Sequence, residues 1–268
     1  MRTVFATRYV VPLREGGSLP AIVEADDDGT YVLKFRGAGQ GAKALVAELI
    51  SGEIARVLGL PVPEIVFVEL DARLGRSEPD TEIRQLIKAS AGLNLALDYL
   101  PGSISFDALV PKVIENEALL ASQIVWFDSF VTNIDRTARN TNLLVWHRKL
   151  WLIDHGASLY FHHSWDGYLE RAASRFPQIK THVLLPWATR LEEVDAQLAP
   201  LLTSEILREI IELVPDEWLH DAPFGVDGSD AATSSTRSTR EAYLQYFAAR
   251  LHPPKLWLEE AENARRLL

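Results

Sequence analysis

Cysteine is absent from the 268 residues of this sequence. Its absence excludes disulfide bonds, zinc sites built on thiolates and a cysteine nucleophile. Long hydrophobic runs are absent too: no stretch reaches the length of a membrane span, and the N-terminal residues lack the apolar core of a signal peptide. We therefore expect a cytoplasmic protein without a membrane span.

The sequence also lacks an excess of positive charge. Its 27 Lys and Arg residues are outnumbered by 37 Asp and Glu residues, so the formal net charge is −10. A chain this acidic has no overall attraction for nucleic acid or anionic lipid, and we expect no direct nucleic-acid partner. Apolar residues make up 47% of the chain, which is typical of a globular protein with a sizeable core.

Short β-prone segments dominate the first hundred residues. Two apolar runs, 21–25 and 30–35, flank Asp28-Gly29, a dipeptide typical of hairpin turns. A turn at 14–18 precedes them, so we expect three consecutive antiparallel strands. Further strand candidates are 64–70, 82–88 and 93–99, with a polar loop at 74–80.

One helix is expected between these strands, from about residue 41 to 58. Val46, Ile50, Ile54 and Val57 recur at helical spacing on one face. Gly59 ends the helix, and the prolines at 61 and 63 follow it.

Pro101-Gly102 marks the predicted boundary between two domains, 1–100 and 101–268. Beyond it the pattern becomes mainly helical, with a long apolar helix at 116–131 and further helices that include 203–214 and 240–250. Residues 227–240 are rich in Ser, Thr, Gly and Ala, and we interpret them as a loop.

The chemistry concentrates where the 116–131 helix ends. Asp135 and Asn140 lie in a polar loop, and two short strands, 142–146 and 150–153, then form a hairpin that leads to Asp154. A hairpin brings the residue before its first strand near the residue after its second, so Asn140 and Asp154 are expected to converge. Amide and carboxylate oxygens suit a hard cation such as Mg²⁺.

Phosphoryl transfer needs such an arrangement, because a metal neutralises phosphate oxygens while a separate carboxylate orients the attacking hydroxyl. The five-residue spacing from Asp135 to Asn140 matches the Asp-x-x-x-x-Asn element of kinase catalytic loops, and Asp154-His155-Gly156 takes the place of Asp-Phe-Gly. Each element alone is common in polar turns. Their order and the intervening hairpin together predict a phosphotransferase site.

Lys34 lies in an otherwise apolar strand, where an ammonium group needs an anionic partner. The helix that follows carries two candidates, Glu48 and Glu53, which face different ways. Ala44 and Gly52 leave room beside Glu48 for another element to approach, but periodicity does not decide between the two glutamates.

These motifs resemble the HipA-like kinase family. The resemblance is carried by Tyr31-Val-Leu-Lys-Phe35 with the glycines after it, Leu58-Gly-Leu-Pro-Val-Pro-Glu64, the Asn133-Ile-Asp-Arg…Asn140 segment and Leu152-Ile-Asp-His-Gly156. The chain looks like a compact branch of that family, related in its catalytic loop to phosphatidylinositol 3- and 4-kinases. The resemblance implies an α+β, bilobal protein-kinase-like fold with an N-terminal antiparallel sheet plus one helix and a mainly helical C-terminal lobe.

The resemblance also implies roles for individual residues. Asp135 is the implied catalytic base, and Asn140 and Asp154 are the implied metal ligands. The implied nucleotide contacts are Lys34 on the phosphates, Glu48 as its partner, Gly16-Gly17-Ser18 as the phosphate loop and Asp98-Tyr99-Leu100 as the hinge beside adenine. Residues 37–41 are a second candidate for the phosphate loop, since they precede a helix N-terminus.

Two departures from the kinase pattern bear on these roles. His155 replaces the phenylalanine of Asp-Phe-Gly, and Thr137 stands where protein kinases often carry a phosphate-binding lysine. Either Arg136 or Arg139 is a candidate for the missing positive charge.

The sequence therefore predicts a kinase that uses ATP and Mg²⁺ and transfers the γ-phosphate to a hydroxyl acceptor. A serine or threonine of a protein is the favoured acceptor, and an antitoxin-like regulator is an expected partner by resemblance. The alternatives are a nucleotide-binding pseudokinase that acts as a regulatory binding module, and a kinase of lipids or small molecules.

Overall fold

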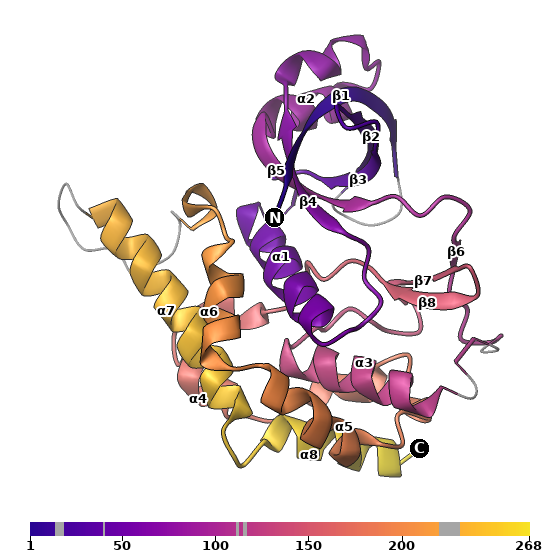
Figure 1. Ribbon diagram of the computed structural model, residues 1–268, viewed down its shortest axis with the longest axis vertical. Helices are drawn as coiled ribbons and strands as arrows, with labels where there is room; N and C mark the ends of the chain where they lie inside the picture. Colours follow the sequence, from indigo (N-terminus) through magenta and orange to yellow (C-terminus); the bar gives the residue numbers. More distant parts are fainter. Residues whose placement is uncertain (14–18, 40, 111–112, 115–116, 220–230) are drawn as a thin grey trace.

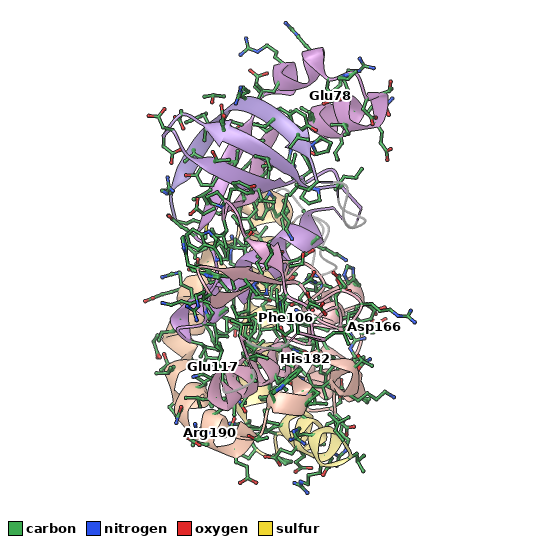
Figure 2. The ribbon with its side chains drawn as sticks, turned by 90° about the vertical axis from the view of Figure 1, so that its right-hand side faces the viewer. Glu78, Phe106, Glu117, Asp166, His182 and Arg190 are labelled. Atoms are coloured by element: carbon green, nitrogen blue, oxygen red, sulfur yellow. The ribbon has the colours of Figure 1, made fainter. Side chains whose placement is uncertain are left out.

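The computed structural model describes residues 1–13, 19–39, 41–110, 113–114, 117–219 and 231–268. A small closed barrel lies at one end and helices at the other (Figure 1). Glu78 marks the barrel end and His182 lies among the helices (Figure 2). No described helix is long and apolar enough to cross a membrane.

The barrel consists of five strands in the order β1-β2-β3-β5-β4. Their bounds are Thr3–Pro12 for β1, Ala21–Ala25 for β2, Thr30–Lys34 for β3, Ile65–Leu70 for β4 and Gly92–Asp98 for β5. The predicted antiparallel succession β1-β2-β3 is confirmed. The expectation of a purely antiparallel sheet is wrong in one pair, because β1 joins β4 in parallel and closes the barrel.

Residues 82–88 form a helix, α2 (Thr81–Ala89), and the predicted strand there is wrong. Asp80 caps this helix, since its Oδ1 accepts a hydrogen bond of 3.0 Å from the Glu82 backbone. Ile83 and Ile87 are four residues apart and both enter the barrel core, which favours helix over strand. A 3₁₀ turn, η1 (Ala72–Ser77), precedes α2, so the barrel carries this helical segment in addition to the predicted helix.

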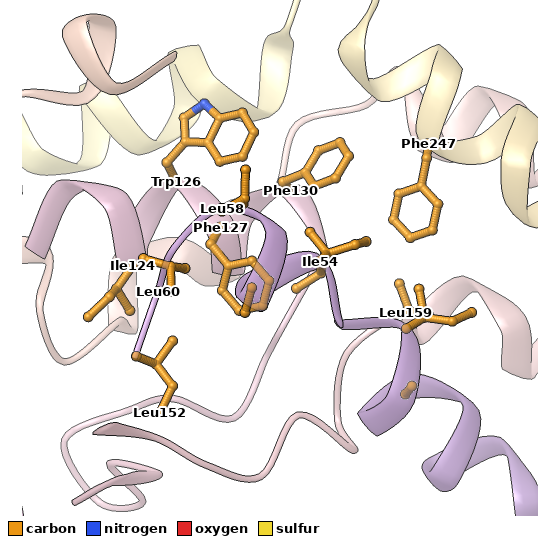
Figure 3. Close-up of a cluster of buried hydrophobic side chains, with 14 of the residues drawn as sticks. Ile54, Leu58, Leu60, Ile124, Trp126, Phe127, Phe130, Leu152, Leu159 and Phe247 are labelled. Carbon is orange, nitrogen blue, oxygen red and sulfur yellow. The ribbon is translucent and has the colours of Figure 1, made fainter. Parts of the chain in front are cut away.

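The predicted helix is α1 (Ala42–Val57), which is buried along most of its length. Its apolar side chains belong to a cluster shared with α3 (Ala118–Phe130) and α7 (Ala231–Leu251), separate from the barrel core. Ile54 and Leu58 lie in this cluster with Phe127 and Phe130 (Figure 3). The packing of α1 therefore links the barrel strands to the helical part, and the boundary at residue 100 stays a prediction.

The remaining strands form a small sheet in the order β6-β7-β8. Its strands are β6 (Ile104–Ser105), β7 (Leu143–Trp146) and β8 (Lys149–Leu152). The predicted hairpin is confirmed as the antiparallel pair β7-β8.

Helices and 3₁₀ turns make up most of the chain after β8. The α-helices are α4 (Tyr168–Ala172), α5 (Leu191–Leu198), α6 (Ser204–Glu212) and α8 (Leu256–Arg266), besides α7. The 3₁₀ turns are η2 (Tyr160–His163), η3 (Pro177–Thr181), η4 (Leu185–Trp187), η5 (Ala199–Leu201) and η6 (Asp216–Trp218).

The predicted loop at 227–240 is wrong from residue 231 onward, because α7 begins there; residues 227–230 lie outside the described chain. Ser235, Thr236 and Thr239 are buried, and the Thr239 hydroxyl donates to the Ser235 carbonyl at 2.8 Å. The hydrogen bond satisfies the buried hydroxyl, and tertiary packing overcomes the weak helix propensity of serine and threonine.

Candidate active site

Three charged side chains from distant segments meet where β3, α1 and the segment after β8 come together. The Lys34 ammonium lies 2.9 Å from Glu48 Oε2 and 2.5 Å from Asp154 Oδ1. The Glu48 side chain is fully buried, the Lys34 side chain is 12% exposed and the Asp154 side chain is 42% exposed. Glu53 pairs with Arg56 instead, so the structure makes Glu48 the partner of Lys34.

The local charges set the protonation of these groups. Burial alone would lower the pKa of Lys34, but the carboxylates of Glu48 and Asp154 raise the pKa above its ordinary value. Burial acts to raise the pKa of Asp154, yet the Lys34 ammonium holds the pKa below its usual range. The cluster therefore contains an ammonium and a partly exposed carboxylate at neutral pH.

The backbone of the Asp154 segment is fixed against α1. Asp154 has φ of 55°, in the left-handed region, and the next amide, of His155, donates to Glu48 Oε2 at 2.8 Å. A Cβ placed on Gly156 would lie 3.6 Å from the Ala44 carbonyl oxygen, which shows how closely this turn approaches the helix. The turn thus approaches α1 at Ala44, beside Glu48, where the sequence predicted room for another element.

The side-chain carboxamides of two asparagines hold Asp135, and only Asn140 was predicted from the sequence. Asn140 Nδ2 donates to Asp135 Oδ2 at 2.7 Å, and Asn142 Nδ2 donates to the same oxygen at 3.2 Å. Asn142 also accepts, through its carbonyl, a 3.1 Å hydrogen bond from the Ile153 amide. Asn142 therefore connects Asp135 to the residue that precedes Asp154, whereas Asn140 hydrogen-bonds Asp135 and makes no hydrogen bond with Asp154.

Arg136 is buried and does not supply a charge to the surface, so this candidate for phosphate contact is excluded. Its Nε donates to Asp128 Oδ2 at 2.6 Å, and its Nη1 donates to the carbonyls of Asn142 and Ile153. Nη2 lies 3.3 Å from His155 Nδ1. Arg136 thus ties α3, both ends of the β7-β8 hairpin and His155 together. Arg139 is exposed and stays a candidate.

Two buried histidines complete this network in their neutral forms. His182 Nδ1 accepts from the Leu184 amide at 3.0 Å, so its proton lies on Nε2, 2.8 Å from Asp128 Oδ2. His155 Nδ1 faces the Arg136 guanidinium, which can only donate, so its proton also lies on Nε2. Burial, together with the charge of Arg136, lowers the pKa of His155 to about 3.

His155 replaces the usual phenylalanine and fills a comparable apolar position. Its ring is fully buried and lies edge-on to Phe127 at 5.6 Å. Its Cδ2 would lie 3.8 Å from a Cβ on Gly52 of α1. The ring Nε2 has no hydrogen-bond partner within the described residues.

The oxygen groups of this site fit a magnesium ion in a complex with phosphates. The Asn140 carboxamide nitrogen donates to Asp135, and the carboxamide oxygen makes no hydrogen bond within the described chain. This oxygen is therefore free to bind a cation. Asp154 offers a partly exposed carboxylate. Mg²⁺ is usually held by one or two such groups together with phosphate oxygens and water. The described residues contain no cluster of three or more His, Cys, Asp or Glu that could hold a metal alone.

The predicted hinge lies at the end of β5. The amides of Asp98 and Tyr99 donate to the carbonyls of Glu64 and Thr30, at 2.8 and 3.0 Å. The Leu100 amide makes no hydrogen bond to a described residue. The predicted phosphate loop, Gly16-Gly17-Ser18, lies outside the described residues.

Asn142, Asp128 and His182 belong to this site but were not predicted from the sequence. Asn142 lies two residues after Asn140, the last residue of the Asp-x-x-x-x-Asn motif. Its closeness to that motif is the signal in the sequence that could have identified it. Asp128 lies inside a helix that reads as apolar, where a charged residue needs a buried partner. His182 carries no local signal that links it to the site.

The chain is similar to one protein family and to several solved structures. The model of the HipA-like kinase family matches residues 8–245. The crystal structure of the Helicobacter pylori proinflammatory kinase CtkA is 14% identical, with a TM-score of 0.53, and the match covers 98% of this chain and 99% of that one.

Two crystal structures of the Golgi casein kinase match less closely. They are 11% and 12% identical to this chain, each with a TM-score of 0.44. The matches cover 96% of this chain and 76% and 74% of those chains. Comparison with curated protein sequences gives no significant match.

The family match spans most of the chain, and the likeness to CtkA shows a shared kinase-like fold of mixed α and β structure. The chain therefore belongs to the HipA-like kinase family.

Proposed function

We propose that this member of the HipA-like kinase family uses ATP and Mg²⁺ to transfer the γ-phosphate to a hydroxyl acceptor. The observation that carries the proposal is the contact of Lys34 with both Glu48 and Asp154. A buried strand lysine held by a helix glutamate, next to a partly exposed carboxylate, is the arrangement that positions nucleotide phosphates in kinases.

Lys34 is the proposed contact for the α- and β-phosphates. Its neighbours keep the ammonium protonated by raising its pKa above the ordinary value, against the effect of burial. Glu48 accepts from both Lys34 and the His155 amide through the same oxygen, and so fixes the lysine relative to the Asp154 segment. This preorganisation supports charge stabilisation without rearrangement during transfer.

Asp135 is the proposed base that accepts the proton of the acceptor hydroxyl. Both amides that hold it donate to Oδ2, and Oδ1 makes no hydrogen bond to a described residue. Oδ1 is thus the oxygen that could receive the proton as the hydroxyl attacks phosphorus.

Asn140 and Asp154 are the proposed ligands of Mg²⁺, which would neutralise charge on the phosphate oxygens. In that case the Asp154 carboxylate serves both the metal and Lys34. Arg139 is the proposed contact for the γ-phosphate, in place of the lysine that Thr137 replaces.

The remaining assignments are proposals that rest on the family. They place adenine at Asp98-Tyr99-Leu100, where the Leu100 amide, which has no partner among the described residues, could donate to the base, and the phosphates under Gly16-Gly17-Ser18. They also include a cytoplasmic location, a protein serine or threonine as acceptor, and an antitoxin-like regulator.

The test is transfer of labelled γ-phosphate with Mg²⁺, to the chain itself and to protein, lipid and small-molecule pools. Asp135→Asn keeps the size of the side chain and removes the base, and Asp166→Asn is a matched control at an exposed acidic residue. We expect transfer by the wild type and the control and its loss in Asp135→Asn. Equal transfer by Asp135→Asn contradicts the assignment of the base.

The acceptor pools separate the alternative functions. Label on lipid or metabolite fractions alone identifies a kinase of small molecules. Saturable ATP binding without transfer to any pool identifies a nucleotide-binding pseudokinase.

A further inference from the structure

The first turn of α1 departs from the usual chemistry of a helix N-terminus. Its N-cap residue, Gly41, has no side chain to accept from the free backbone amides, and its first turn carries no acidic residue. Lys43 occupies that turn, where the helix dipole already places partial positive charge. The Lys43 side chain makes no ion pair or hydrogen bond with any described residue.

A cavity of about 110 Å³ opens at this turn. Residues of α1, η2, η6 and α7 line it, among them Lys43, His162, Trp218 and Tyr243. A single water molecule needs roughly 10–15 Å³ of accessible cavity volume, so this cavity has room for a larger group. Lys34, Glu48 and Asp154 are not part of its lining, which separates it from the candidate active site.

Two buried ring nitrogens of the lining residues have no partner among the described residues. The fully buried His162 has its Nδ1 2.8 Å from the Tyr243 hydroxyl, and its Nε2 makes no hydrogen bond within the described part of the chain. The Tyr243 hydroxyl can donate to Nδ1 or accept from it; when it donates, the imidazole proton lies on Nε2, which is then a hydrogen-bond donor. Trp218 Nε1, which can only donate, is also buried, with no partner in the residues that the structure describes.

The unpaired side chains and helix amides that the described part of the chain places at this cavity can thus all donate hydrogen bonds. They are the backbone amides of Ala42 and Lys43, the Lys43 ammonium and the ring nitrogens of His162 and Trp218. Buried donors without acceptors are unfavourable, and a group with several acceptor oxygens would satisfy them together. Helix N-termini hold phosphate groups in this way.

We propose that this cavity is a second ligand site, which binds the phosphate group of a small molecule at the N-terminus of α1. Glu48 lies five residues beyond Lys43 on the same helix. An anion bound here would hold α1 in the position that pairs Glu48 with Lys34. This effect on the active site rests on the proposed kinase function, whereas the binding site itself does not.

The test is isothermal titration calorimetry with inorganic phosphate, performed with and without a saturating non-hydrolysable ATP analogue. We expect saturable binding of one phosphate that persists with the analogue. Lys43→Met and His162→Phe should each raise the Kd about tenfold, the loss expected for one charge-assisted or buried hydrogen bond. Lys180→Met is the control at an exposed lysine and should leave the Kd unchanged.

Thermal unfolding separates loss of binding from loss of folding. Phosphate should raise the Tm of the wild type and of Lys180→Met, and should raise that of Lys43→Met much less, because only a bound ligand stabilises the native state. Acetate should bind more weakly than phosphate. Absence of saturable binding, equal binding by Lys43→Met, or binding of acetate as tight as that of phosphate overturns the proposal.

Discussion

The ammonium of Lys34 lies 2.5 Å from Oδ1 of Asp154, although 120 residues separate the two in the chain. Lys34 ends a barrel strand, and Asp154 follows the β7-β8 hairpin. Glu48 receives hydrogen bonds from Lys34 and from the residue after Asp154, so α1 holds the two together. The candidate active site therefore depends on where α1 packs.

Lys34→Met should abolish most phosphate transfer. The change keeps an unbranched side chain of similar size, one atom shorter, and removes the charge proposed to hold the phosphates. Loss of one such preorganised electrostatic contact lowers kcat by about 10²–10³-fold in other enzymes, and we expect a similar loss here. Steady-state kinetics at varied ATP measures it, with Lys180→Met as the exposed control. Unchanged kcat and KM for ATP would show that Lys34 has only a structural role.

Asn142→Gly should lower kcat without changing the fold. Asn142 has φ of 47°, which glycine adopts readily, so the change removes the amide contact with Asp135 and leaves the backbone unstrained. One lost hydrogen bond of about 1–1.5 kcal/mol predicts roughly a tenfold fall in kcat. His147→Gly is the matched control, because His147 has the same φ in the exposed hairpin turn. A similar kcat in both variants would speak against a positioning role for Asn142.

Arg136→Met should destabilise the protein strongly. The change leaves the buried Asp128 carboxylate with His182 and Asn133 but without its guanidinium partner. Breaking a buried ion pair in this way costs about 3–5 kcal/mol. Urea denaturation measures the free energy of unfolding, and Arg73→Met, at an exposed pair with Asp71, should change it little, because water screens such a pair.

Asp128→Asn tests the same network from the other side. Combined with Arg136→Met, it should cost less than the sum of the two single changes, because the coupled charges are removed together. Strictly additive costs would mean that the two side chains do not interact in solution.

His155→Phe should weaken the pH dependence of stability. Burial, aided by Arg136, lowers the pKa of His155 to about 3 from an ordinary value of 6.5. Between these values the unfolded chain binds a proton that the folded chain does not, so stability falls as pH decreases through that window. The contribution of one such group is about 1.4 kcal/mol per pH unit.

Urea denaturation at several pH values within this window measures the slope for wild type, His155→Phe and a control, His147→Phe. The pKa values of His162 and His182 are also lowered by burial, so some slope should remain in the variant. A slope equal to that of the wild type would mean that His155 titrates normally in the folded chain.

Much of the fold could be predicted from the sequence because its signals are local. The hairpin between β2 and β3, the limits of α1 and the β7-β8 hairpin follow from turn residues and apolar periodicity within a few residues. The mistakes have a physical cause as well. Residues 82–88 carry a short apolar pattern that suits either strand or helix, and the barrel core selected the helix by burying Ile83 and Ile87. Packing likewise made residues from 231 onward helical despite their serine and threonine content.

The sequence by itself determined the residues that can carry the chemistry: a lysine in an apolar strand, an acid and an amide five residues apart, and an acid after a hairpin. Their types and spacing are fixed in the chain, whatever its fold. Only the tertiary structure decided that Lys34 meets Glu48 rather than Glu53, that Arg136 turns inward, and that Asn142 joins Asp135. These choices depend on how α1, α3 and the barrel pack against each other, and contacts across such distances leave no periodic trace in the sequence.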